Sequence, residues 1–302
     1  MAVSTVKAII NGTEYTLTYN GTSGKYETTV TAPSTSSYNQ SGHYYNVQVK
    51  ATDTAGNVTT KDATDATLGN SLRLTVKEHV APVIIITAPT ASALIINNKP
   101  AIAWNVTDLD SGVNPDTIQV TIDSTVITSA SITKTAITNG YSCSYTPETA
   151  LTDGIHTIKV DASDNDGNAA AQKSVSFTVD TVSPTLSVTS PTAGLVKNDS
   201  ACTVNGTTND VTSSPVTVTV KLNSGTAEAV AVNGDGTFTK ALTLVAGTNT
   251  ITVVATDGAG KTTTVTRTVT LDTTPPTISA VTFTPNPVDA GATYVIAVTV
   301  TD

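Results

Sequence analysis

The sequence predicts an all-β protein built from a row of tandem β-sandwich units. Thr and Val dominate the composition, and such β-branched residues suit the pleated surface of a strand. Apolar and polar residues alternate at a period of two throughout the chain, and no window sustains the period of 3.6 that a helix requires. A length of 302 residues is enough for two or three domains that each bury a core.

Three segments of the chain repeat an alternating strand that closes on the turn pattern Asp-x-x-Gly-Asn/Lys. These segments are 43–57, 156–168 and 249–261, and their turns begin at Asp53, Asp164 and Asp257. Because Asp bonds its own downstream backbone and Gly accepts a positive φ, the pattern predicts a β-hairpin. In the first repeat, we expect residues 72–76 to be the second strand of this hairpin. A short linker then follows each repeat, around Pro82, Pro184 and Pro276, and linkers this short favour a semi-rigid rod.

Each repeat therefore has about seven short strands separated by turn signals, which describes an immunoglobulin-like sandwich. The hairpin motif, together with the linker motif Asp-Thr-x-x-Pro at Asp180 and Asp272, resembles bacterial immunoglobulin-like repeats. Such repeats form the tandem domains of bacteriophage tail and fibre proteins and of bacterial surface adhesins. The resemblance covers nearly the whole chain and implies a non-enzymatic structural or adhesive role.

The chain begins and ends part-way through a repeat. Residues 6–11 match 118–123 and 218–223, so the first unit has no counterpart of its first two strands. Residues 276–302 match 82–108, which hold those two strands. We therefore expect one sandwich to be split between the termini; the alternative is a piece cut from a longer array. The expected segments are an incomplete sandwich at 1–80, sandwiches at 81–180 and 181–273, and a two-strand tail at 274–302.

The tail is predicted to complete the incomplete sandwich of a second copy by donor-strand complementation. Its apolar residues are the predicted assembly site: Ile278, Val281, Phe283, Tyr294, Ile296, Val298 and Val300. Such a head-to-tail contact gives a ring or a filament, and we expect the filament. The alternative is a stalk or binding module of an adhesin that recognises a surface carbohydrate or protein, for which the Tyr-rich stretch 38–45 is the candidate patch.

Charge and hydropathy exclude several kinds of partner. The net charge is −9 and the 15 Lys and Arg residues are scattered, so we expect neither nucleic acid nor membrane as a partner. Residues 1–7 do not have the form of a signal peptide, so we expect synthesis in the cytoplasm and a place in a virion or outside the cell after release. We expect Trp104 in a core, and Cys143 and Cys202 as small buried side chains without a disulfide.

No residue pattern indicates catalysis or a cofactor. The three histidines, His43, His79 and His156, have no Ser or Cys partner at a recognisable spacing, so we expect no enzyme. Calcium is the one ligand considered, because Asp108 and Asp110, and likewise Asp164 and Asp166, place oxygen ligands close together. The same residues also fit turns that cap their own backbone. The third repeat has Gly258 and Ala259 at the equivalent turn, so we expect calcium to be at most a minor stabiliser.

Overall fold

The computed structural model describes residues 2–302, and its extended elements confirm the predicted all-β class. Within that range the helical segments are four short 3₁₀ turns, at Ser37–Asn39, Ser41–His43, Gly69–Leu72 and Ser129–Ser131. None of the described residues forms a helix long and apolar enough to cross a membrane. Packing divides the chain into two compact units, one made of the residues up to Ala93 with Asn97–Val179, the other of Leu94–Ile96 with Asp180–Asp302. This division is coarser than the four expected segments, which stay a prediction.

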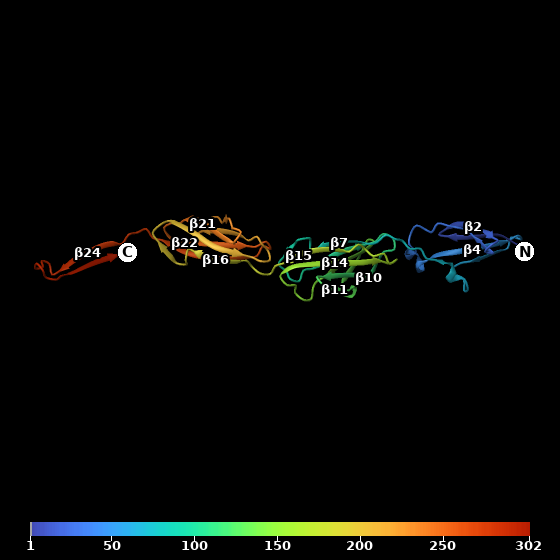
Figure 1. Ribbon diagram of the computed structural model, residues 1–302, viewed down its shortest axis with the longest axis horizontal. Helices are drawn as coiled ribbons and strands as arrows, with labels where there is room; N and C mark the ends of the chain where they lie inside the picture. Colours follow the sequence, from blue (N-terminus) through green and yellow to red (C-terminus); the bar gives the residue numbers. More distant parts are fainter. Residues whose placement is uncertain (1) are drawn as a thin grey trace. The chain divides into compact units, whose positions relative to one another are not determined.

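The N-terminal sheet is a single sheet formed by the first six strands (Figure 1). These are β1 (Val3–Ile10), β2 (Thr13–Asn20), β3 (Lys25–Glu27), β4 (Tyr45–Asp53), β5 (Val58–Lys61) and β6 (Arg73–Leu74). Their order is β3-β2-β1-β4-β5, and β6 pairs with the start of β4. The Asp53 turn joins β4 to β5, so the prediction that 72–76 forms the second hairpin strand is wrong: only Arg73 and Leu74 pair, beyond an inserted 3₁₀ turn.

The middle sandwich packs two sheets face to face. One has the order β11-β10-β14-β15-β8 and the other the order β12-β13-β9-β7. The strands are β7 (Val83–Ala88), β8 (Leu94–Ile95), β9 (Ile102–Thr107), β10 (Val113–Ile122), β11 (Thr125–Ile127), β12 (Thr133–Ile137), β13 (Gly140–Tyr145), β14 (Gly154–Asp164) and β15 (Lys173–Val179). Alternate residues of β9, β10 and β14 are buried, as period-two patterning predicts. Trp104 lies fully in this core, and Cys143 is buried and unpaired.

The C-terminal sandwich repeats this design with the sheets β16-β18-β21 and β17-β23-β22-β19-β20. Its strands are β16 (Thr185–Ser190), β17 (Leu195–Lys197), β18 (Ala201–Asn209), β19 (Thr217–Leu222), β20 (Glu228–Val230), β21 (Thr237–Thr243), β22 (Gly247–Thr256) and β23 (Thr262–Leu271). Val204, Ile251 and Val253 centre its core, which also contains the free Cys202. Gly206 is required there, because a Cβ atom on it would lie 2.4 Å from both the Ser187 carbonyl oxygen and the Phe238 ring.

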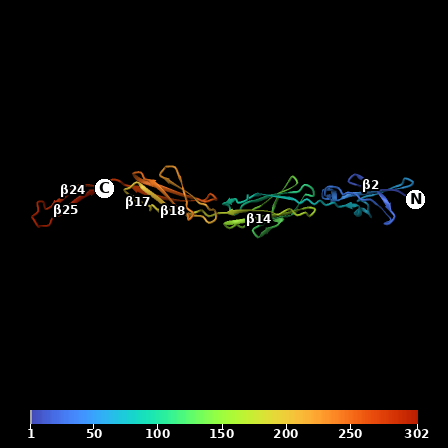
Figure 2. The same cartoon turned by 45° about the horizontal axis from the view of Figure 1, so that its top comes forward.

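The tail hairpin consists of β24 (Thr277–Thr284) and β25 (Val295–Thr301), which pair only with each other (Figure 2). The register places Ile278 opposite Val300, Val281 opposite Val298, and Phe283 opposite Ile296. A bulge between Ile278 and Ala280 keeps Ile278 on the same face as Val281 although the two are three residues apart. The hairpin therefore has one apolar face, made of the seven residues that the sequence predicts as an assembly site.

Candidate functional site

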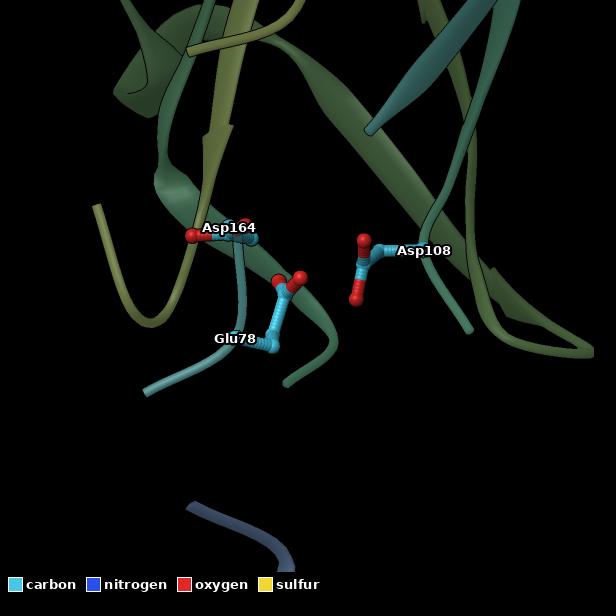
Figure 3. A group of neighbouring side chains, drawn as sticks. All are labelled: Glu78, Asp108 and Asp164. Carbon is cyan, nitrogen blue, oxygen red and sulfur yellow. The ribbon is translucent and has the colours of Figure 1, made fainter. Parts of the chain in front are cut away.

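Two groups of three carboxylates occupy equivalent places in the two sandwiches. The middle triad is Glu78, Asp108 and Asp164, and the C-terminal triad is Asp180, Asp210 and Asp257. In each group, one carboxylate oxygen of every member lies within 4.8 Å of the others. Each triad takes one residue from the segment before the sandwich and two from strand ends. Figure 3 shows the middle triad side chains approaching one another from three separate segments.

Hydrogen bonds from Asn168 hold the middle triad together. The Asn168 side-chain amide donates to Asp164 Oδ2 at 2.7 Å and to Glu78 Oε1 at 3.2 Å, and the Asn168 backbone N–H donates to Asp164 Oδ1 at 2.8 Å. Burial raises the pKa of Glu78. Burial also acts to raise the pKa of Asp164, but the hydrogen bonds from Asn168 outweigh it and the pKa is lowered. Of Glu78 and Asp164, Glu78 therefore takes up a proton first.

The C-terminal triad also has three carboxylates, and fewer hydrogen-bond donors reach it. Asp180, Asp210 and Asp257 are 0%, 8% and 6% exposed. Asp210 Oδ1 accepts two backbone N–H bonds at 2.8 Å, and Asp180 Oδ2 accepts from the Ser213 hydroxyl. The Asn168 position is held by Lys261, whose backbone N–H donates to Asp257 Oδ1 at 2.8 Å. Asp257 Oδ2 is buried and has no hydrogen-bond partner within residues 2–302.

The structure brings together only half of the residues that the sequence suggested as calcium ligands. Asp108 and Asp164 belong to the middle triad, whereas Asp110 accepts the Ser36 backbone N–H at 3.0 Å and Asp166 accepts that of Glu78 at 3.0 Å. Asp110 and Asp166 are not members of the triad, because their side chains accept bonds from the Ser36 and Glu78 backbones. Their part in a calcium site stays a prediction. In the third repeat Gly258 and Ala259 stand at the positions of Asn165 and Asp166. Since neither of those residues belongs to the middle triad, this replacement does not count against a cation in the third repeat.

Sequence reasoning missed the C-terminal triad although each member lies in a repeated motif. Asp180 begins the linker motif, Asp210 follows a strand, and Asp257 begins the hairpin motif. The signal that could have found it is the recurrence of all three acids at matching positions in successive repeats. The recurrence is less evident because the middle sandwich has Glu78, and not Asp, at the position that Asp180 occupies in the C-terminal sandwich.

The buried histidine of the middle sandwich belongs to a structural pair. His156 Nδ1 lies 2.8 Å from Asp123 Oδ2, and Nε2 lies 2.7 Å from the Thr152 carbonyl oxygen. Burial acts to lower the pKa of His156, but the Thr152 carbonyl and the Asp123 carboxylate together outweigh it and raise the pKa. Both ring nitrogens thus face acceptors, which favours the doubly protonated imidazolium.

The Tyr-rich stretch makes contacts within its own part of the chain. Tyr38 stacks on His43 with ring centroids 4.1 Å apart, the Arg73 guanidinium lies 4.8 Å from the centre of the Tyr44 ring, and Tyr45 is buried. A stretch engaged in this way does not present a row of open aromatic faces for a sugar to stack on.

The apolar face of the tail hairpin is open. Its seven predicted residues are between 45% and 65% exposed, from Phe283 to Ile278. In the middle sandwich the equivalent pair of strands, β7 and β9, buries its inner face: Ile84, Trp104 and Val106 are 2% exposed or less. The tail residues thus have the composition of an inner sandwich face without the burial.

The N-terminal sheet also has an apolar face that is incompletely buried. Val120 and Val160 are partners on adjacent strands of one sheet of the middle sandwich, and both are fully buried. Their counterparts in the N-terminal sheet, Ala8 and Val49, pair in the same way but are only half-buried. Within residues 2–302, no second sheet covers this face as it does in the two sandwiches.

Comparison with known proteins agrees with this architecture. Residues 92–181 match the family model described as "Bacterial Ig-like domain". The middle sandwich is thus similar to a bacterial immunoglobulin-like domain. Residues 184–273 match the model described as "Glucodextranase, domain B", an accessory domain and not a catalytic one. Ig-like domains are generally non-catalytic, but a fold of this kind does not by itself assign a function. Comparison with curated proteins finds no match.

Solved structures with similar domains share little sequence with the Ig-like repeats. The fibronectin(III)-like modules of Clostridium thermocellum CbhA are 17% identical, with 63% of this chain and 94% of that chain covered and a TM-score of 0.38. Titin domains A168–A170 are 15% identical, with coverages of 87% and 85% and a TM-score of 0.40. Sidekick-1 immunoglobulin domains 1–4 are 9% identical, with coverages of 89% and 68% and a TM-score of 0.40.

Proposed function

We propose that this Ig-like repeat protein is a non-catalytic structural subunit that assembles head to tail with copies of itself. The tail hairpin of one copy completes the N-terminal sheet of the next and forms a fibre. The observation that carries the proposal is the pair of complementary open faces, one on the hairpin and one on the N-terminal sheet. Docking them would bury both faces as in the complete sandwiches, and backbone pairing would set the register.

The equivalence of the hairpin with β7 and β9 supports this docking. Ile278 pairs with Val300 in the hairpin as Ile84 pairs with Val106 in the middle sandwich. Left open, an apolar and uncharged pair of strands is an aggregation hazard that proteins normally cover. Burying such a side chain is worth about 1.5–3 kcal/mol, so covering the whole face is strongly favourable.

The repeated acids support the same match. Asp272 and Asp302 have the spacing of Asp180 and Asp210. Asp53 in the N-terminal sheet is the counterpart of Asp164, and its carboxylate is held by the Asn57 backbone and side chain in the same way. Docking the hairpin on the N-terminal sheet would thus bring together the same three positions that form a triad in each complete sandwich.

The docked register predicts one particular contact. In the middle sandwich Trp104 of β9 pairs with Cys143 of β13. Aligning Tyr26 with Tyr141 makes Thr28 the counterpart of Cys143, and Val298 is the counterpart of Trp104. Residues 28–33 form no strand although they continue β3, so their backbone is available to pair with β25.

The experiment measures assembly and register together. Analytical ultracentrifugation of the 302-residue chain should show oligomers that grow with concentration, and the double variant Val281→Asp with Val298→Asp should be monomeric. Thr282→Asp, on the other face of the hairpin, is the matched control and should still assemble. Mixing a Thr28→Cys chain with a Val298→Cys chain under oxidising conditions should give a disulfide-linked dimer. A monomeric wild-type chain, or cross-linking no faster than between control cysteines, would refute the proposal.

A further inference from the structure

We propose that the C-terminal triad, Asp180, Asp210 and Asp257, is a calcium-binding site. The inference concerns a single copy of the chain and does not depend on head-to-tail assembly. It rests on three features: an orphaned carboxylate oxygen, uncompensated buried charge, and the contrast with the middle triad.

The orphaned oxygen is Asp257 Oδ2. Asp257 is 6% exposed, and its other oxygen is engaged by the Lys261 backbone N–H. Buried side-chain oxygens are almost always hydrogen-bonded, and an exception calls for an explanation such as an ion. This oxygen belongs to a carboxylate that contributes to a group of three within 4.8 Å, so a cation there would satisfy it.

The buried charge of the triad has no cationic partner. Across residues 2–302, no Lys, Arg or His forms an ion pair with Asp180, Asp210 or Asp257. Carboxylates removed from water are costly unless they are paired or coordinate a metal. The donors that reach this triad are backbone N–H groups and one hydroxyl, from Ser213, and they carry no full charge.

In the middle triad, side-chain donors reach two of the three acids. There the Asn168 amide donates to both Asp164 and Glu78, and the Ser111 hydroxyl donates to Glu78 at 3.2 Å. In the C-terminal sandwich Lys261 replaces Asn168. Among the described residues, the bonds to these acids come from backbone N–H groups and the Ser213 hydroxyl, and none comes from a side-chain amide. Of the two triads, the C-terminal one is therefore the one in which a buried carboxylate oxygen, Asp257 Oδ2, has no hydrogen-bond partner among the described residues.

Calcium fits these oxygens better than magnesium does. Ca²⁺ takes about 6–8 oxygen ligands in flexible geometry, whereas Mg²⁺ demands an octahedron and usually keeps several waters. Members that are 0–8% exposed leave little room for a hydrated ion. Three carboxylates from separate segments supply hard oxygen ligands, some of them able to bind through both oxygens.

Calorimetric titration of CaCl₂ into the chelator-treated 302-residue chain tests the site. We expect about one Ca²⁺ per chain, with MgCl₂ binding at least about tenfold more weakly. Asp257→Asn should weaken calcium binding by at least about tenfold. Asp199→Asn, which removes an exposed acid of the same sandwich outside the triad, is the matched control and should leave the affinity unchanged.

Lys261→Asn separates coordination from simple electrostatics. Removing a nearby positive charge should strengthen calcium binding if only net charge matters. If the Asn amide occupies the site as Asn168 does, calcium binding should weaken by about tenfold while all three acids remain. Folding of each variant is checked by the calcium-free urea transition, so that loss of binding is not confused with unfolding. Absence of calcium heat, full binding by Asp257→Asn, or equal affinity for magnesium would overturn the assignment.

Discussion

Replacing Val160 by Ala should destabilise the middle sandwich by about 2–3 kcal/mol. Val160 lies in β14 opposite Val120, and both side chains are fully buried between the two sheets. Truncation removes two buried carbon groups at about 0.8 kcal/mol each. The cavity that remains adds a further cost, because the close-packed sheets relax only in part.

Trp104 makes this loss directly measurable. It is the single Trp of the chain and is fully buried in the middle sandwich, so its fluorescence reports the unfolding of that sandwich. With a urea dependence of about 1–3 kcal/mol per molar, the Val160→Ala midpoint should fall by about 0.7–3 M. Val253→Ala makes the same change at a fully buried site of the C-terminal sandwich and should leave the Trp104 transition unmoved.

Two outcomes would refute the reasoning. A shift of the Trp104 midpoint by less than about 0.2 M for Val160→Ala would mean that the site is not a close-packed core. An equal shift for Val253→Ala would mean that the two sandwiches unfold as one cooperative unit, in which case the loss cannot be assigned to packing around Val160.

Two further predictions use the same transition and the free thiol. Because the pKa of His156 is raised in the folded state, the stability that protonated His156 contributes is complete below the unfolded pKa of about 6.5 and is lost as pH rises through the folded pKa. The urea midpoint of the Trp104 transition should therefore fall from about pH 6.5 upward, and it should fall less in Asp123→Asn. A midpoint that rises with pH would contradict this. Burial raises the pKa of the Cys143 thiol to about 11, so alkylation by iodoacetamide at pH 8 should be slow in buffer and fast in urea, and fast labelling of the folded chain would show that the thiol is accessible.

Local patterning was enough to predict the class of fold and its turns. A strand needs only alternation along its own length, and an Asp-Gly hairpin needs only residues a few positions apart. The turns at Asp53, Asp164 and Asp257 each join two paired strands, and Trp104 is buried as expected. The apolar face of the tail could also be predicted, although the bulge that aligns Ile278 with Val281 could not.

The carboxylate sites were decided by tertiary structure, because their members come from segments far apart in the sequence. Asp108 and Asp110 are two residues apart in the chain, yet the turn after β9 sends their side chains to different partners. Asp180 and Asp257 are distant in the chain, yet the packing of the two sheets brings them together. Sequence alone could show that each acid belongs to a turn, but the distances between turns depend on how the strands pack. Only the folded chain leaves Asp257 Oδ2 buried without a partner, and that is what makes one triad a candidate cation site.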